Sequence, residues 1–420
     1  MMNIPKLLER PIVRSGQKID VALLWMVVLM TAFSLLMIYS ASIAYAAAEG
    51  GSQFSFVGKQ AVFVGGTLAG CLGLSLMSMN VWKKIMPWYF AASCLLLVAV
   101  LFLGREINGA TRWIHIGPVN LQPTELFKLA VVLYLSSLFT RRAEVLQGLD
   151  KVGFKSLALG TLDLLLAPFQ VRARGRVREI WQRFRTILLP MIMLTVGLML
   201  VMAQPDFGSF VVIVSIIMGM LFLAGFPGKY FTVLASMMVA GMGLLIIAAP
   251  YRMARVAAFL NPWADPLGKG YQLTHSLMAI ARGEWFGVGL GASLEKRFYL
   301  PEAHTDFIFA VIGEEFGFMG MCVLVFCYGW LVLRAFSIGR QARELELAFS
   351  AYIAYGIGIW IGIQSFFNIG VNIGILPTKG LPLPLMSYGG SAVLVMLVCI
   401  TLLLRIDYEN RQKMRGYKVE

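Results

Sequence analysis

Charged residues are scarce in this chain. Only 14% of its 420 residues are Asp, Glu, Lys or Arg, whereas a soluble globular protein carries about 25%. Hydrophobic residues make up 59% of the sequence, and the mean hydropathy is +0.76. This composition excludes an ordinary soluble enzyme or soluble binding module and predicts an integral membrane protein.

Two other sequence patterns are missing. The chain has no series of short segments in which apolar and polar residues alternate, so a transmembrane β-barrel is not expected. The five cysteines all fall inside apolar runs, without a Cys-x-x-Cys pair or the spacing of metal ligands. Such cysteines are typical of buried free thiols. Disulfides, redox chemistry and a protein-built metal site are therefore not indicated.

Long apolar runs predict an all-α fold. A helix needs about 20 apolar residues to cross a bilayer. Eight uncharged runs reach about this length, and two weaker runs contain Lys128 and the pair Glu314 and Glu315. The prediction is an integral membrane protein of ten transmembrane helices, near 21–45, 60–80, 85–103, 122–140, 186–204, 207–227, 230–250, 307–333, 347–370 and 383–404.

The basic residues predict the orientation of these helices. Most of the 36 Lys and Arg residues lie in segments on the same side of the membrane as both termini. By the positive-inside rule, both termini are cytoplasmic, and the large 251–306 loop between helices 7 and 8 is extracytoplasmic. The net charge of +14 then reflects orientation and attraction to anionic membrane lipid. No nucleic-acid partner is expected, because the arginines lie in loops between spans.

This topology divides the chain into a cytoplasmic N-terminal tail (1–19), a ten-helix transmembrane domain (20–405) and a cytoplasmic C-terminal tail (406–420). The basic cytoplasmic loop 141–186 combines an apolar patch with the alternating arginines 172, 174, 176 and 178. It predicts an amphipathic segment on the inner membrane face, with a docking site for a cytoplasmic partner as the alternative. No internal repeat is evident, which disfavours an inverted-repeat transporter.

The candidate chemical centre lies at the end of the 251–306 loop. Glu302, His304 and Asp306 stand directly before an apolar run. A carboxylate at a membrane surface, beside a wide polar loop, is well placed to act on a substrate whose head group lies there. The alternative is structural, because Thr305 or Asp306 could serve as the N-cap of the following helix.

Two further groups of charges are functional candidates. Glu125 and Lys128 are spaced i,i+3, so they share one helix face and can pair. Ionisable residues at membrane depth are costly, so this pair either stabilises the bundle or lines a polar cavity that contacts substrate. Arg105 and Arg112 lie in an outer loop, where they oppose the orientation signal, and arginine suits anionic phosphate.

The segment between the ninth and tenth predicted helices is rich in proline and glycine. It contains Lys379, Ser387 and Gly389. Irregular backbone near membrane depth is tolerated only where protein or water covers it, which is typical of a cavity wall. Close packing of helices at the glycines is the alternative.

Four blocks of residues together resemble a known family. They are 108–128, 203–208, 251–309 and 380–391, in an order and spacing that cover most of the chain. The sequence is similar to the SEDS proteins (shape, elongation, division and sporulation), which include FtsW, RodA and SpoVE. The third block is the most specific, and its sequence Pro-Glu-Ala-His-Thr-Asp-Phe-Ile resembles the FtsW division branch.

This resemblance implies a peptidoglycan glycosyltransferase that polymerises lipid II into glycan strands during septal cell-wall synthesis. The site of action would be the outer face of the bacterial cytoplasmic (inner) membrane, at the division septum. The essential carboxylate of the family maps onto Asp306. The implied partners are lipid II, the growing glycan strand, a class B penicillin-binding protein that acts as transpeptidase, and other divisome proteins.

The expected mechanism is an inverting displacement. Asp306 would act as general base on the acceptor hydroxyl, and cations would stabilise the leaving pyrophosphate. A divalent cation, Mg²⁺ or Mn²⁺, is a further candidate for this role. Glu302 and His304 would orient Asp306, or His304 would only cap or pack, while Ser387 and Gly389 would shape the cavity. The candidate substrate-binding residues are Arg105, Arg112, Glu125, Lys128, Glu302, His304, Lys379, Ser387 and Gly389.

Other functions remain open at this stage. A lipid II flippase would use the same polar cavity but needs no base, so Asp306→Asn would leave transport intact. A non-catalytic divisome scaffold would tolerate loss of all cavity charges while its surface remained intact. An O-antigen ligase or polymerase is disfavoured by the specific third block.

Overall fold

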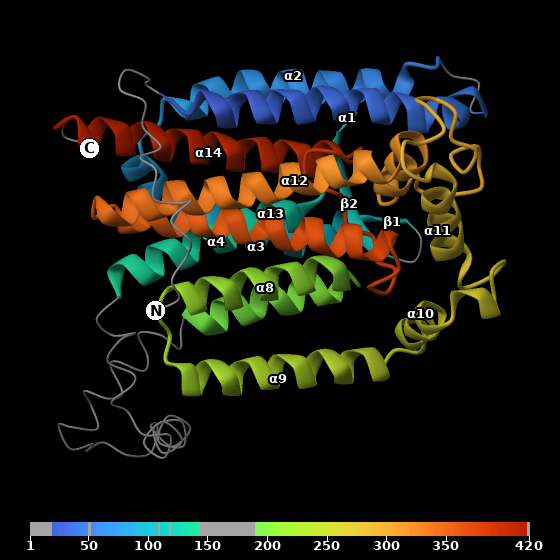
Figure 1. The fold of residues 1–420 in the computed structure, drawn as a ribbon. Coiled ribbons are helices and arrows are strands. Elements are labelled where there is room, and N and C mark those ends of the chain that lie inside the picture. The colour runs from blue at the N-terminus through green and yellow to red at the C-terminus, as the bar shows by residue number, and fades with distance from the viewer. Residues whose placement is uncertain (1–18, 49–51, 108–109, 117–118, 143–189, 418–420) are drawn as a thin grey trace.

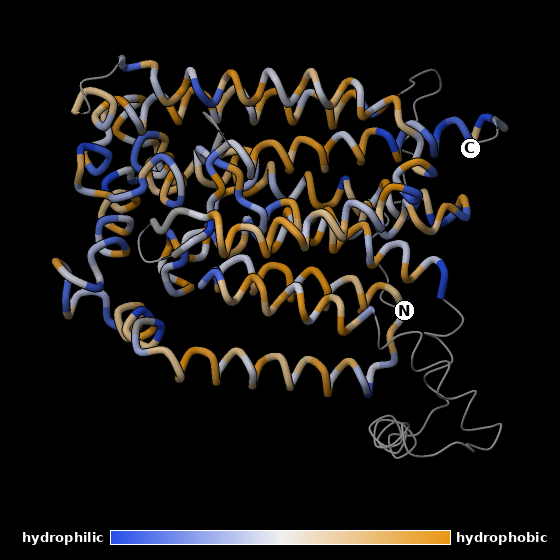
Figure 2. The backbone as a smooth tube through the Cα atoms, turned by 180° about the vertical axis from the view of Figure 1, so that it is seen from behind, coloured by the Kyte–Doolittle hydropathy of each residue, from blue (hydrophilic) through white to orange (hydrophobic). Residues whose placement is uncertain are grey.

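The computed structural model describes residues 19–48, 52–107, 110–116, 119–142 and 190–417 (Figure 1). The predictions for the 1–19 tail and the 141–186 loop therefore fall almost wholly outside the described residues. The long helices lie side by side along one direction, and the segments that join them gather at the two ends of the bundle. Apolar residues cover the middle of the helices, whereas hydrophilic residues gather near the ends (Figure 2).

The elements follow one another along the chain in this order: α1 (Val21–Ala48), α2 (Ser55–Ser75), α3 (Met79–Leu103), β1 (Arg105–Ile107), β2 (Ala110–Ile116), β3 (Val119–Leu121), α4 (Pro123–Arg141), an unlabelled helix (Pro190–Ala203), α8 (Phe207–Leu223), α9 (Gly228–Ile247), α10 (Pro250–Leu260), the 3-10 turn η4 (Pro262–Ala264), α11 (Tyr271–Gly283), α12 (Ile308–Glu344), α13 (Ala348–Asn372) and α14 (Gly390–Met414).

Seven of these helices are long and apolar enough to cross a membrane: α1, α2, α3, α9, α12, α13 and α14. Three more helices coincide with predicted spans. The helix Pro190–Ala203 and α8 are apolar but shorter, and α4 contains the charged residues Glu125 and Lys128. The prediction of a multi-pass helical membrane protein is therefore confirmed.

A small sheet departs from the all-α prediction. β2 pairs antiparallel with both neighbours, with Arg105 of β1 opposite Trp113 and Asn120 of β3 opposite His115. The Ala-Thr-Arg-Trp-Ile-His-Ile sequence of β2 contains β-branched and aromatic residues that favour a strand. A search for apolar runs long enough to cross a bilayer misses these strands, because they are short and lie between two such runs.

The 251–306 segment, predicted as a polar loop, contains the helices α10 and α11. Both lie at the same end of the bundle as β1 and β2 (Figure 1). A search for long apolar runs cannot find them, because amphipathic helices space their apolar residues at the helical period. This segment is therefore a folded cap on one end of the bundle.

α12 is broken near its start at Gly317, whose φ of 68° and ψ of −166° are not helical. The chain between α11 and α12 fills the break with backbone hydrogen bonds. The amides of Phe318 and Met319 donate to the carbonyls of Glu284 and Trp285, at 2.8 and 3.1 Å. In return, the amide of Val288 donates to the carbonyl of Glu314 at 2.9 Å. The break is therefore satisfied by protein, as irregular backbone in a membrane protein requires.

Two buried carboxylates on α12 anchor the same segment. Glu314 accepts hydrogen bonds from the side chains of Arg282 and Ser293, at 3.1 and 2.5 Å, and from the amide of Leu294 at 3.0 Å. Glu315 pairs with Lys296 at 2.6 Å and accepts a hydrogen bond from Ser40 of α1 at 2.7 Å. Charges buried in this way are tolerated because they are paired and hydrogen-bonded. These acidic residues hold the chain that leads to Asp306.

Gly287 offers a test of this attachment. Its φ is +82°, and an added Cβ would lie 2.1 Å from the carbonyl oxygen of Glu315. Gly291 has nearly the same φ, +83°, but nothing within 4 Å of an added Cβ. Gly291→Ala should cost about 1–2 kcal/mol of backbone strain, and Gly287→Ala at least about 2 kcal/mol more because it also forces the segment off α12. Thermal unfolding in detergent measures the stability of the two variants. Equal losses of stability would contradict the close attachment of Gly287 to α12.

Candidate functional site

Five separate parts of the sequence meet at the end of the bundle that carries α10 and α11. They are β2, the start of α8, the start of α12, the end of α13 and the 373–389 segment that leads into α14 (Figure 1). Each contributes a polar or charged residue to the surroundings of Asp306. The candidate functional site is therefore a product of the tertiary fold.

The backbone of Asp306 is held by two amide side chains of α13. Its carbonyl oxygen accepts hydrogen bonds from Nδ2 of Asn368 at 2.8 Å and Nδ2 of Asn372 at 3.1 Å. Oδ1 of Asn372 also accepts from the amide of Ala310, in the first turn of α12, at 3.1 Å. The N-cap of α12 is Phe307, and no side chain caps it from that position. The capping alternative for Thr305 and Asp306 is therefore wrong.

Asn368 fixes the opposite side of the site as well. Its Nδ2 also donates to the carbonyl oxygen of Leu381 at 2.7 Å. The preceding residue, Gly380, faces the Asp306 carboxylate, because an added Cβ would lie 3.0 Å from Oδ2. One amide group thus connects the Asp306 backbone to the segment that faces its side chain, and glycine at 380 leaves room beside the carboxylate.

The carboxyl group of Asp306 lies in an environment that disfavours ionisation. The residue is half-buried and forms no ion pair among the described residues. Burial is the main cause that raises its pKa to about 7, and the negative charges of Glu302 and Asp206 raise it further. Arg112 and Arg255 oppose this shift through their positive charges. A carboxyl group with a pKa near neutrality can accept and release a proton at physiological pH.

Lys379 supplies a second group with a shifted pKa. Its ammonium lies over the rings of Phe207 and Phe367, 4.6 and 5.5 Å from their centroids. Burial, followed by the charge of Arg255, lowers the pKa of Lys379 to about 8. A desolvated cation in this position interacts more strongly with an anion than an exposed lysine does.

Arg112 of β2 lies close enough to act electrostatically on Asp306. Its Nε and Nη2 donate to the carbonyl oxygens of Gln204 and Pro205 at 3.3 and 2.5 Å. Asp206 follows these residues and caps α8 by accepting from the amide of Ser209 at 3.1 Å. The guanidinium is thereby fixed at the start of α8.

Glu302 and His304 differ in what they contact. The exposed Glu302 accepts a hydrogen bond from Thr305 Oγ1 at 2.7 Å and has a φ of +56°, a strained value for a non-glycine residue. The ring of His304 packs among those of Phe56, Tyr388 and Tyr45, with centroids 5.1 to 5.6 Å apart. Glu302 acts on Asp306 through its charge, whereas these ring contacts favour the packing alternative for His304.

Ser387 and Gly389 hold the 373–389 segment in place. Ser387 is buried, and its hydroxyl donates to the carbonyl of Thr305 at 2.6 Å while accepting from the amide of Leu383 at 2.7 Å. The amide of Gly389 donates to Gln60 Oε1 of α2 at 3.3 Å. Ser387 thus joins the residue before Asp306 to the segment opposite it.

Glu125 and Lys128 form a buried ion pair of 2.6 Å, with side-chain exposures of 2% and 0%. Lys128 also donates to Oε1 of Gln364 on α13 at 3.1 Å, and Gln364 donates to the carbonyl of Pro382 at 2.8 Å. The pair is therefore connected through Gln364 to the 380–384 segment. This geometry favours the structural alternative for the pair.

Arg105 lies in β1, opposite Trp113, and its side chain is outside the described part of the chain. Several residues near Asp306 were not singled out as its neighbours from the sequence: Asp206, Arg255, Asn368, Asn372 and Gly380. Asn372 and Gly380 lie between the ninth and tenth predicted helices, in the segment interpreted as a cavity wall, and Asn368 lies at the end of the ninth. Asp206 lies in the 203–208 block of the family resemblance, which assigns it no role.

No group of three or more His, Cys, Asp or Glu side chains suited to a metal ion occurs within the described ranges. A divalent cation at this site would therefore need ligands from the substrate. Mg²⁺ is commonly bound through one or two carboxylates together with substrate phosphates. The Asp306 carboxylate fits this type of ligand.

The fold and this site define a multi-pass membrane protein with a desolvated carboxyl group among cations at one end of its bundle. The chain matches the family described as Cell cycle protein (FTSW_RODA_SPOVE) over residues 21–412. It therefore belongs to the FtsW/RodA/SpoVE family, as the sequence resemblance predicted.

Similar proteins agree with this assignment. A protein of Neisseria gonorrhoeae named "Probable peptidoglycan glycosyltransferase FtsW" is 66% identical over 99% of this chain and 90% of its own length. A protein of Aromatoleum aromaticum with the same name is 44% identical over 96% of this chain and 91% of its own length.

Solved structures share the fold. One chain, from a structural study of polymerization and crosslinking by a peptidoglycan synthase complex, has a TM-score of 0.69 and 26% identity, covering 94% of this chain and 99% of that one. The rod shape determining protein RodA of Thermus thermophilus has a TM-score of 0.60 and 24% identity, covering 95% and 99%.

The buried ion pair gives a second prediction. Lys128→Met should lower the free energy of unfolding by about 3–5 kcal/mol, because it leaves the Glu125 charge buried without its cation. The double variant Glu125→Gln/Lys128→Met should recover a large part of this loss. Chemical or thermal unfolding measures the stability of wild type, the single variant and the double variant. Lys84 is exposed, so Lys84→Met serves as a control for the removal of a positive charge. If the double variant were as unstable as the single one, the pair would not be structural.

Proposed function

We propose that this chain is a peptidoglycan glycosyltransferase that polymerises lipid II into glycan strands for septal cell-wall synthesis, with Asp306 as general base. The observation that carries the proposal is the desolvated carboxyl group of Asp306, whose backbone is fixed by Asn368 and Asn372 and on which the charges of Arg112 and Arg255 act. Membership of the FtsW/RodA/SpoVE family and the names of the similar FtsW proteins support it.

The reaction joins an acceptor sugar to a lipid-linked donor. The acceptor hydroxyl oxygen attacks the anomeric carbon of the donor, and the bond from that carbon to the pyrophosphate oxygen breaks. Asp306 takes the hydroxyl proton, and the polyprenyl pyrophosphate leaves with the bonding electrons. Direct displacement inverts the anomeric centre. A positioned base typically contributes a factor of about 10²–10⁴ to the rate.

Negative charge accumulates on the leaving pyrophosphate as the bond breaks. Cations that are already in place stabilise this charge without reorganisation in the transition state. Lys379 and Arg112 take this role, and Arg105 is a third candidate. Lys379 suits it because its ammonium is desolvated against Phe207 and Phe367. A divalent cation, Mg²⁺ or Mn²⁺, held by Asp306 and phosphate oxygens, would supply further charge neutralisation.

The proposed topology has ten transmembrane helices, counting α4, the helix Pro190–Ala203 and α8 with the seven long spans. Both termini are cytoplasmic, and the 251–306 segment faces the outside. Asp306 then lies at the outer face of the cytoplasmic membrane, where the lipid II head group is presented. The protein works at the division septum with a class B penicillin-binding protein and other divisome proteins. A peptidoglycan synthase complex among the similar structures supports the first partnership.

Polymerisation of labelled lipid II by the purified protein with its transpeptidase partner tests the proposal. Wild type should produce glycan chains, and Asp306→Asn should reduce the rate by at least about 10²-fold because the amide cannot accept the proton. Both proteins must show equal thermal stability and equal partner binding. Ser293→Ala, which removes a contact to Glu314 rather than to substrate, controls for disturbance of the loop.

Equal chain production by wild type and Asp306→Asn would remove Asp306 from the mechanism. If neither protein made chains while both transported lipid II across a vesicle membrane, the flippase alternative would replace the glycosyltransferase. Absence of both activities from wild type, with partner binding intact in every cavity variant, would favour a scaffold.

A further inference from the structure

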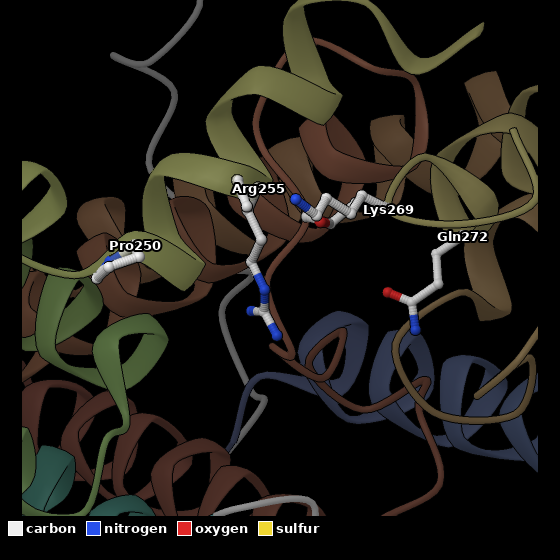
Figure 3. Close-up of a pocket in the computed structure, with 6 residues that line it drawn as sticks. Pro250, Arg255, Lys269 and Gln272 are labelled. Carbon is white, nitrogen blue, oxygen red and sulfur yellow. The ribbon is translucent and has the colours of Figure 1, made fainter. Parts of the chain in front are cut away.

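A cavity with basic side chains on its walls lies close to the site of Asp306, between α10 and the start of α11. Its volume is about 470 Å³. Figure 3 shows Arg255 reaching into it from α10, with Lys269 and Gln272 on the opposite side and Pro250 at the start of α10. The lining residues are Pro250, Ala254, Arg255, Lys269, Gln272 and Thr378.

The polar groups of this cavity are suited to an anion. Arg255 and Lys269 carry positive charge, and Gln272 and Thr378 can donate hydrogen bonds. No acidic residue is among the described residues that line the cavity. Within the described ranges, neither Arg255 nor Lys269 forms an ion pair with a carboxylate. A guanidinium and an ammonium on opposite walls match an anion with several oxygens, because arginine binds phosphate oxygens in pairs and lysine contributes a point charge.

Lys269 is presented by an ordered turn. Its amide donates to Oδ2 of Asp265 at 3.0 Å, and the amide of Gly270 donates to the carbonyl of Asp265 at 3.0 Å. An added Cβ on Gly268 or Gly270 would lie 2.3 Å from the Asp265 side chain or 2.2 Å from the carbonyl oxygen of Pro262. The turn therefore requires glycine at 270, where the close atoms are backbone, and it holds Lys269 across the cavity from α10.

The cavity is close to the candidate site but distinct from it. Asp306 does not line it, yet the charge of Arg255 acts on both Asp306 and Lys379. Thr378 lines the cavity and directly precedes Lys379. Pro250 begins α10 immediately after α9, one of the seven candidate spans. The cavity therefore lies near the membrane surface, at the level of a lipid head group.

Polymerisation of a lipid-linked sugar involves two pyrophosphates. One belongs to the donor and leaves, while the other belongs to the acceptor and stays attached to its sugar. In the proposed function, Arg112, whose charge acts on Asp306, and Lys379 serve the leaving pyrophosphate next to the reacting carbon. A second anion site is needed for the other, and this cavity offers two basic side chains close to the candidate site.

We propose that the cavity formed by Arg255, Lys269, Gln272 and Thr378 is a second binding site for the pyrophosphate of a polyprenyl-linked substrate. This inference rests on the proposed function. The site binds and positions the lipid-linked substrate and takes no part in proton transfer. Arg255 has a double effect, because its charge also acts on Asp306 and Lys379.

The first test measures binding without catalysis. The probe is polyprenyl pyrophosphate without a sugar, titrated into the purified protein with its transpeptidase partner. Arg255→Gln/Lys269→Gln should raise the Kd at least about tenfold, since hydrogen bonds to charged groups are the stronger class. Arg297→Gln removes an exposed charge from the same segment and should leave the Kd within about twofold. An unchanged Kd in the double variant, or an equal loss in the control, would overturn the proposal.

The second test identifies which pyrophosphate binds. A lipid II analogue that lacks the acceptor hydroxyl can only donate. It is varied against fixed lipid II in one series, and lipid II is varied against fixed analogue in the other. Relative to wild type, the double variant should raise the KM at least about tenfold in one of the two series. The substrate varied in that series is the one whose pyrophosphate the cavity binds. No rise in either series would overturn the proposal. Because the binding test needs no turnover, failure of wild type to polymerise would contradict only the proposed function.

Discussion

The two amide side chains at the end of α13 fix the position of the Asp306 backbone. Asn368 and Asn372 both donate to its carbonyl oxygen. Asn368 also donates to the carbonyl of Leu381, next to Gly380, which faces the carboxylate. A hydrogen bond of this kind contributes about 1 kcal/mol net, but a buried carbonyl left without a donor costs about 1–3 kcal/mol. The main chain is therefore constrained, and the carboxyl group can remain in surroundings that disfavour its charge.

The half-buried Asp306 differs from three buried glutamates of the bundle in having no cation partner. Glu314, Glu315 and Glu125 are each matched by a cation. These pairs attach the chain after α11 to α12 and join α4 to α13 through Gln364. Asp306 forms no such pair, and its neighbours raise its pKa. Among the described acids, Asp206 is also buried without a cation, but it accepts hydrogen bonds from Gln122, Thr124 and Ser209. No hydrogen bond from the described residues reaches the Asp306 carboxylate, which leaves this group available for chemistry.

Much of this arrangement could be predicted from the sequence. Apolar runs located the long helices, and the polar stretch before α12 located the candidate site. The small sheet, α10 and α11 were missed because they lie in polar segments, where a search for long apolar runs detects no secondary structure. α14 continues to Met414, beyond its predicted end near 404, because Asp407 and Arg411 pair and are buried there. The partners of Asp306 were missed because Asn368 and Gly380 meet it only through tertiary contact.

The pH dependence of kcat/KM for polymerisation tests the central claim most directly. The base acts only when ionised, so kcat/KM should fall as the pH drops through about 7, the raised pKa of Asp306. Removal of a negative neighbour favours ionisation, so Glu302→Gln should move this acid limb to lower pH. A profile that stays flat down to the ordinary carboxyl range, or one that Glu302→Gln leaves unchanged, would contradict a desolvated Asp306 as the base.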